Sequence, residues 1–399
     1  MSHDPIQDLS HLRVSAALAV GTMAVLMVGV QPILLGELVE ARQVSLEGVG
    51  IVAMAEIITL GLGVVLGDAL LPAARLRLVT LVAALLAAGL DALTLLASGD
   101  GPLTGVRAAA GLAEGVLVWG TTGVVVRTGN PARVGGVFFV VQTLAQALLG
   151  ALLANAVIPQ WGWQGGFVAL GVLVLLACGL AFVQPASLAS LAPPAVSGFR
   201  WSAATLLPLA VVFFQLATLG AFWAYLEPLG KAVGLDSRAA QTLIAGVLAM
   251  QVVGGSVAAL AVRRLPVIPA LLGCAILLGA IVLTVHQLPA GSLQAFAVAC
   301  GLFGFVWLFM LPFHIGLAFR ADASGRLAGL VPAAQLLGSA FGPLTASFMV
   351  EGDNAAGVPL ISAGFAMAAV VLLSVLLLVT RAPRPAIPAT GASGQARTS

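Results

Sequence analysis

The chain has 399 residues, of which 60% are hydrophobic and only 8% are charged, with 17 basic and 15 acidic side chains. A soluble domain carries about 25% charged residues, so this composition excludes a soluble enzyme, a nucleic-acid-binding protein and a disordered protein. The apolar runs are long and continuous, whereas a transmembrane β-barrel alternates over segments of ~10 residues. The sequence therefore predicts an all-α membrane protein.

A helix needs about 20 apolar residues to cross a bilayer, and runs of that length predict twelve transmembrane helices. The start of the chain carries Asp4 and Asp8 before a run longer than that of a signal peptide, so we expect a retained first helix. The expected spans are 13–36, 48–69, 77–97, 103–126, 135–157, 164–183, 204–226, 239–261, 267–287, 293–318, 328–349 and 358–379.

The second half of the chain repeats features of the first at nearly constant spacing. Glu37 and Gly111 recur 190 residues later as Glu227 and Gly301, and Arg133 recurs 193 residues later as Arg326. Such agreement predicts two pseudo-symmetric six-helix bundles that arose by duplication. We expect an N-terminal bundle at 1–184, a cytoplasmic linker at 185–203, a C-terminal bundle at 204–382 and a disordered cytoplasmic tail at 383–399.

Basic residues predict the orientation, because cytoplasmic loops are enriched in Lys and Arg. Thirteen arginines flank the side that holds both termini, whereas the other side has only Arg42, Lys231 and Arg238. Both termini are therefore expected in the cytoplasm. The composition, rich in Ala, Gly and Arg with a single Lys, is typical of a GC-rich bacterial genome and favours the bacterial inner (plasma) membrane.

Two motifs resemble those of the major facilitator superfamily. The stretch from Arg107 to Gly115 resembles its fourth-helix motif, and Trp161 to Phe167 resembles the entry to its sixth helix. The loop from Gly67-Asp68 to Arg77 matches only loosely, with Leu71 and Pro72 where a Gly and an Arg are typical. The fifth helix lacks the Gly-Pro motif of drug/proton antiporters, and a similar Gly-Pro lies in the eleventh, at 342–343.

The resemblance implies a transporter rather than an enzyme, in which two halves rock about a midplane site lined by spans one, four, seven and ten. Its partners would be a small organic solute, a proton and the lipid bilayer, and the chain would act as a monomer. The sequence contains no phosphate-binding loop, metal-ligand cluster or catalytic triad, so no cofactor, metal or nucleic acid is expected.

Four ionisable residues lie inside expected spans, where each charge costs at least ~2.5–3.5 kcal/mol. They are Glu56, Asp91, Arg107 and Glu114, all in the first half. Arg107 and Glu114 are seven residues apart and share one face of the fourth span, which we expect to line the cavity. Asp91 and Arg107 form a structural ion pair in one interpretation. In the other, Arg107 binds an anionic substrate or controls a nearby proton.

Glu56 and Glu114 lack sufficient positive partners, so either is a candidate proton carrier, and the alternative is a neutral hydrogen-bond donor. For the solute, polar and aromatic residues on the expected cavity helices are candidate contacts or ordinary packing residues. Besides Arg107, these are Gln146, Gln215, Trp223, Tyr225 and Trp307.

Three further residues are notable for their place in the spans. Glu37 and Glu227, at matching outer ends, are either interface residues or an outer gate, and His314 is expected to be a polar cap at a kink. The function favoured is proton-coupled secondary transport by alternating access. The alternatives are a proton-independent facilitator and a non-transporting membrane sensor or assembly factor.

Overall fold

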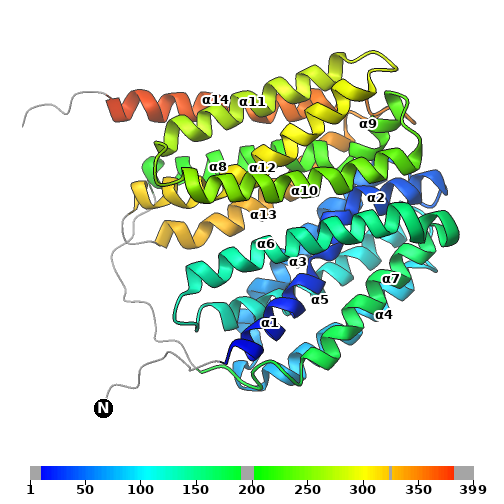
Figure 1. Cartoon of the computed structure of the whole chain (residues 1–399), viewed down its shortest axis with the longest axis vertical. Coiled ribbons are helices and arrows are strands. Elements are labelled where there is room, and N and C mark those ends of the chain that lie inside the picture. Colours follow the sequence, from blue (N-terminus) through cyan, green and yellow to red (C-terminus); the bar gives the residue numbers. More distant parts are fainter. Residues whose placement is uncertain (1–9, 190–201, 323–325, 382–399) are drawn as a thin grey trace, which may run out of the picture.

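The computed structural model describes residues 10–189, 202–322 and 326–381, which fold into helices packed side by side (Figure 1). Within these ranges the only β pairing is an isolated bridge between Glu351 and Asn354. Most of the expected linker at 185–203 and the expected tail at 383–399 lie outside the described residues.

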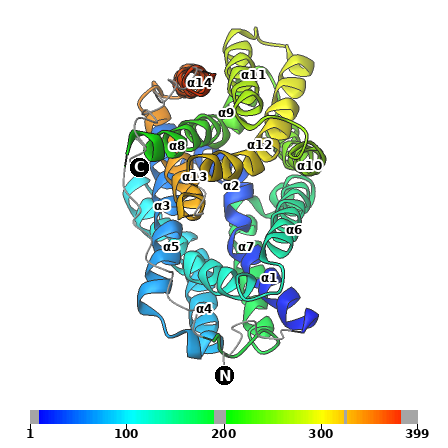
Figure 2. The same cartoon turned by 90° about the vertical axis from the view of Figure 1, so that its left-hand side faces the viewer.

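The first half of the chain forms one bundle and the second half forms another (Figures 1 and 2). The N-terminal bundle comprises α1 (His11–Ala24), α2 (Leu26–Glu40), α3 (Leu46–Leu70), the short η1 (Ala73–Arg75), α4 (Leu76–Thr94), α5 (Asp100–Val125), α6 (Pro131–Leu152), η2 (Leu153–Val157) and α7 (Ile158–Leu180). The C-terminal bundle comprises α8 (Ala203–Ala224), α9 (Leu226–Ala232), α10 (Ser237–Ala261), α11 (Val267–Gln287), α12 (Leu293–Ala321), α13 (Arg326–Ser347) and α14 (Val358–Arg381).

Eleven helical stretches in the described ranges are long and apolar enough to cross a membrane. One of them, Arg133–Leu180, is 48 residues long and contains two spans, because the chain turns at Gly162, where φ is +59°. Glycine adopts this conformation without the clash that a Cβ would cause. The twelve predicted spans are thus present, but the break expected between 157 and 164 is helical up to this glycine, and the fifth span ends in the π-helical turn η2 just before it.

The first predicted span, 13–36, is broken where the sequence predicted a continuous helix, at Val25 between α1 and α2. The seventh ends close to its predicted end at 226, where Tyr225 separates α8 from the short α9. Pro228 explains the second break, because proline has no N–H to bond the carbonyl of Ala224 and its ring crowds that turn. Both breaks bend a helix that lies between the two bundles.

The predicted duplication is confirmed by the helix positions. The helices α3, α4 and α5 begin 191, 191 and 193 residues before α10, α11 and α12, respectively. In each bundle a pair of glycines lets two of these helices touch, since a Cβ at Gly63 or Gly111 would strike the partner's backbone, as it would at Gly254 or Gly304. These close contacts fix the depth at which α3 meets α5 and α10 meets α12.

The two bundles are joined by hydrogen bonds toward the end of the molecule where α2 ends and α10 begins, here called the outer end. The Gly50 N–H donates to the Tyr225 hydroxyl at 3.1 Å, and the Arg238 guanidinium donates to the Asn155 side chain at 3.3 Å. At the same end α3 packs on α13 and α6 packs on α10 (Figure 1). The molecule is therefore closed between its bundles at the outer end.

Candidate functional site

The four ionisable residues predicted inside the spans meet in one cluster within the N-terminal bundle. Glu56 comes from α3, Asp91 from α4, and Arg107 and Glu114 from α5. Their exposed fractions are 0%, 2%, 0% and 3%, so water does not reach them in this conformation. Gly111 lies between Arg107 and Glu114 and contacts the Glu56 backbone, which brings α3 and α5 close enough for the side chains to pair.

Arg107 is the centre of this buried cluster. Its Nη1 donates to Asp91 Oδ1 at 2.7 Å, and its Nη2 pairs with Glu56 and lies 3.4 Å from Glu114 Oε1. The guanidinium also lies 5.4 Å from the ring centroid of Phe167 on α7, which adds a cation–π contact. The predicted Asp91–Arg107 pair is present, and Arg107 engages the two glutamates as well.

The two glutamates differ in how their oxygens are satisfied. Glu56 accepts from Arg107 with one oxygen and from the Gln31 amide, at 3.2 Å, with the other. Glu114 has only the 3.4 Å contact to Arg107, and its Oε2 has no hydrogen-bond partner within the described residues. Gln31 on α2 was not predicted, because an amide in an apolar run gives no signal until the partner carboxylate is known.

The expected orientation of the fourth span needs correction. Arg107, Gly111 and Glu114 do share one face of α5, but this face packs against α3 and α4 and does not line an open cavity. Three carboxylates and one guanidinium cannot all be exposed to lipid or left unpaired in the interior, so burial against neighbouring helices is the favourable arrangement.

A second polar site lies at the break between α1 and α2. The Val25 carbonyl accepts a hydrogen bond from the Gln146 amide of α6 at 2.7 Å, and the Val28 carbonyl accepts one from the Trp223 indole of α8 at 3.3 Å. The Val28 carbonyl is available because Pro32, four residues later, has no N–H to donate. We call this region, from Val25 to Pro32, the α1–α2 junction, and side chains from both bundles converge on it.

The six candidate solute contacts do not form one pocket. Gln146 and Trp223 reach the α1–α2 junction, and Trp307 packs edge-on against Trp223 with ring centroids 5.3 Å apart. Arg107 belongs to the charged cluster. Tyr225 is fully buried and accepts from the Gly50 N–H at the outer end.

Gln215 faces the interior of the C-terminal bundle, where it bonds the Leu271 carbonyl and His314. His314 is fully buried and is not the polar cap that was expected. Because the Gln215 oxygen can only accept, the His314 Nε2 carries the proton, and the Gln335 amide donates to its Nδ1 at 3.2 Å. The three side chains link α8, α12 and α13.

At the outer end, Glu37 and Glu227 belong to a set of polar side chains that crosses between the bundles. We call Glu37, Glu40, Glu227, Lys231 and Gln241 the outer network. The Lys231 ammonium lies 2.7 Å from Glu40 and 3.0 Å from Glu227, while the Gln241 amide donates to Glu37 at 2.5 Å.

Three carboxylates therefore face one ammonium in the outer network. Burial raises the pKa of Glu227, just beyond the span Thr205–Ala224, to about 8, although Lys231 beside it acts in the opposite direction. The sequence indicated Glu37 and Glu227 but not Gln241 or the role of Lys231.

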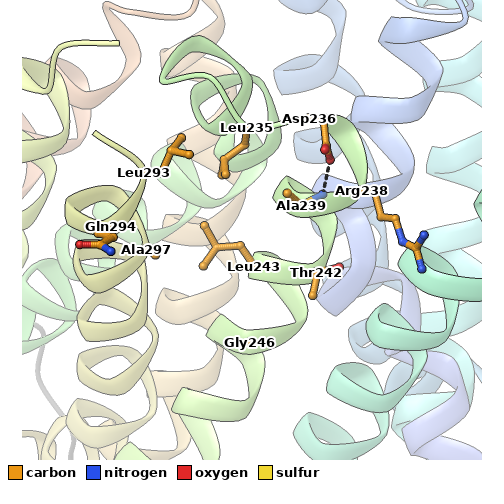
Figure 3. Close-up of a pocket in the computed structure, with 10 residues that line it drawn as sticks. All are labelled: Leu235, Asp236, Arg238, Ala239, Thr242, Leu243, Gly246, Leu293, Gln294 and Ala297. Carbon is orange, nitrogen blue, oxygen red and sulfur yellow. Dashed lines mark hydrogen bonds between the residues drawn. The ribbon is translucent and has the colours of Figure 1, made fainter. Parts of the chain in front are cut away.

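A pocket of about 620 Å³ lies between α10 and α12 near the outer end (Figure 3). Its charged side chains are already engaged elsewhere. The Asp236 carboxylate caps α10 by accepting from the Ala239 N–H, and Arg238 points away from the pocket and bonds Asn155 of η2. Most of the remaining lining is apolar, so this pocket is a weaker candidate for solute recognition than the α1–α2 junction.

The sequence matches no protein-family model and no curated protein. The structure, in contrast, is similar to solved transporters. A nucleoside transporter, NupG (a D323A mutant), aligns with a TM-score of 0.65 at 13% identity over 91% of this chain and 99% of that chain.

A bacterial homologue of the human lysosomal transporter Spinster aligns in two inward-facing forms. The occupied form gives a TM-score of 0.68 at 12% identity, covering 95% of this chain and 98% of that chain. The unoccupied form gives 0.61 at 14% identity, covering 92% and 96%.

Proposed function

Because the chain has the fold of the major facilitator superfamily, we propose that it is a secondary transporter that moves a small organic solute by alternating access, coupled to protons. The observation that carries this proposal is the buried charged cluster. Three carboxylates surround one guanidinium, so full ionisation would leave a net charge of −2 in a site without water. Such a site favours binding of at least one proton.

Glu114 is the proposed proton carrier. Asp91 and Glu56 each have a close partner in Arg107, and Glu56 has a second in Gln31, so both are better satisfied by hydrogen bonds than Glu114 is. The Glu114 Oε2 has no partner in the described structure, and a proton there would remove the negative charge that is least compensated. When a conformational change opens this cluster to neutral water, the proton would leave.

The coupling to the solute is proposed to pass through α2. Gln31 bonds Glu56 in the charged cluster, and it stands next to Pro32, whose missing N–H frees the Val28 carbonyl for Trp223. A change of charge at Glu56 or Glu114 would change the strength of the hydrogen bond between Gln31 and Glu56. This change would shift the α1–α2 junction. The affinity for a solute bound beside Gln146, Trp223 and Trp307 would depend on the position of the junction, because these residues come from both bundles.

The test begins with a solute panel screened by thermal shift on the purified protein, including nucleosides because of the likeness to a nucleoside transporter. The solute that stabilises the protein is then added to liposomes containing a trapped pH-sensitive dye. Solute-driven proton movement is expected with wild type and not with Glu114→Gln. Solute flux without proton movement would contradict coupling.

The alternative is a proton-independent facilitator, in which the charged cluster is purely structural. The pairing of Arg107 with both Asp91 and Glu56 favours this alternative. In that case the dye would report no proton movement, and Glu114→Gln would leave solute flux unchanged. A non-transporting sensor would bind a solute without any flux. The proposal also places the protein in the bacterial inner membrane as a monomer, with both termini in the cytoplasm.

A further inference from the structure

A groove of about 600 Å³ runs along the lipid-facing side of the N-terminal bundle, between α4 and α5. Short side chains make it, because Ala83, Ala109 and Ala113 line it where larger residues would fill the space. The exposed side chains of Val82 and Leu86 border it. From Arg75 to Leu90 the groove follows 15 residues of helix, or ~22 Å, which exceeds the depth of one ~15 Å leaflet.

Arg75 lines the groove at the opposite end of the molecule from the outer network, just before α4 begins. Its side chain is exposed, and no acid or other acceptor in the described structure pairs with it, in contrast to Arg77, which bonds the Ala181 carbonyl. The groove thus combines an apolar channel of lipid length with one free positive charge at the membrane surface. A phospholipid with an anionic headgroup complements both features.

We propose that this groove binds an anionic phospholipid, with one acyl chain along α4 and α5 and the headgroup phosphate at Arg75. The bound acyl chain would pack against the exposed face of α5, and the opposite face of this helix carries Arg107 and Glu114. It is independent of the proposed transport function, because it requires only that the bundle sits in a membrane.

The test is native mass spectrometry of the full chain with phosphatidylglycerol or phosphatidylcholine. Wild type is expected to retain one phosphatidylglycerol more tightly than phosphatidylcholine. Arg75→Gln should weaken phosphatidylglycerol binding about fivefold, the effect of losing one surface charge, and weaken phosphatidylcholine less, because the choline cation offsets the phosphate charge of that lipid. Ala109→Phe should weaken both lipids because it fills the groove.

Matched controls lie on the other bundle. Arg264→Gln changes an exposed arginine in the loop between α10 and α11, and Ala280→Phe enlarges an exposed residue of α11, the repeat partner of α4. Both should bind lipid as wild type does. Equal affinity of wild type for the two lipids, or unchanged phosphatidylglycerol binding by Arg75→Gln, would overturn the proposal. Equal competition by inorganic phosphate would also overturn it, by indicating a simple anion site.

Discussion

Glu114 and Glu56 belong to the same charged cluster but differ in the number of hydrogen bonds that their carboxylate oxygens accept. Glu56 is held at both oxygens, whereas one Glu114 oxygen has no partner in the described structure. An acid satisfied as a carboxylate is a structural counter-ion, and an acid left unsatisfied gains most from a proton. We therefore expect Glu56 to act as a structural counter-ion and Glu114 to bind the proton.

For Glu114→Gln we expect the loss of solute accumulation driven by a pH gradient. Solute exchange at equal pH should stay within about twofold of wild type, because Gln keeps the shape and hydrogen bonding of the protonated acid. Both rates are measured in liposomes. Normal gradient-driven accumulation by this variant would rule out Glu114 as the carrier.

Glu56→Gln should instead act on stability. It replaces one of the two acceptor oxygens of Glu56 with an NH2 group, so Arg107 or Gln31 loses its acceptor, and breaking such a buried pair costs ~3–5 kcal/mol. The expected result is a lowered unfolding temperature in detergent, with Glu114→Gln as the matched control at near wild-type stability. Equal stability of the two variants would contradict the assignment.

Arg107→Lys tests the guanidinium itself. Lys retains the charge but loses the planar fork that reaches Asp91 and Glu56 together, so the variant should insert and fold yet lose most transport. The triple variant Asp91→Asn, Glu56→Gln and Arg107→Gln, which removes Arg107 together with both close partners, should also fold and stay inactive. Full transport by the triple variant would reduce Arg107 to a structural ion-pairing residue.

At the scale of single elements, the break between α1 and α2 exposes backbone carbonyls to side chains from both bundles. Trp223→Phe keeps the aromatic ring against Trp307 but removes the hydrogen bond to Val28, worth about 1 kcal/mol. Solute affinity, measured by thermal shift or calorimetry, should fall about fivefold. Trp161→Phe is the control, since Trp161 is 61% exposed and remote from the junction. Equal loss in both variants would remove Trp223 from the site.

The helices could be predicted from the sequence because each span needs a long apolar run, and the runs are separated by charged or proline-containing segments. The break at Val25 could not, since residues 14–36 contain no charged side chain and Pro32 lies seven residues beyond the break. The turn at Gly162 lies within the break expected between 157 and 164, but its form, one positive φ in place of a loop, could not be predicted.

The members of the charged cluster could also be predicted, because ionisable residues in apolar runs are conspicuous. Their arrangement could not. Glu56 and Arg107 are 51 residues apart, and their pairing depends on the close approach of α3 and α5 through Gly63 and Gly111. A periodic pattern identifies a shared face on one helix, but it does not identify which neighbour that face meets.

Considered as a whole, the molecule is closed at its outer end by a network in which three carboxylates face Lys231. The Glu227 pKa is raised by burial to about 8, so closure favours the protonated form. The stabilisation is fully present below the ordinary pKa of 4.5 and is lost as the pH rises through about 8, when Glu227 adds its charge to Glu37 and Glu40.

Spin labels at Ala41→Cys and Ala232→Cys, one in each bundle, would report this change as a distance. We expect the separation to widen between pH 7 and 9 in wild type. With Glu227→Gln the distance should not depend on pH in that range, because Gln cannot ionise. A pH-independent distance in both proteins would contradict control by Glu227.

The orientation predicted from the arginines is tested with reporter fusions at position 198 and after position 385. Both should report the cytoplasm, since thirteen arginines against three basic residues favour that side. A reporter that is active outside the cytoplasm at either position would reverse the topology.

The charged cluster has a consequence for how the chain enters the membrane during synthesis. The span that carries Arg107 and Glu114, Asp100–Val125, has the lowest hydropathy of the first four spans, at 1.3. Its arginine finds its counter-charges on Glu56 and Asp91, which belong to the two spans made immediately before it. The translocon would therefore release α5 into lipid only alongside α3 and α4, so that these three helices leave with Arg107 already paired rather than one at a time.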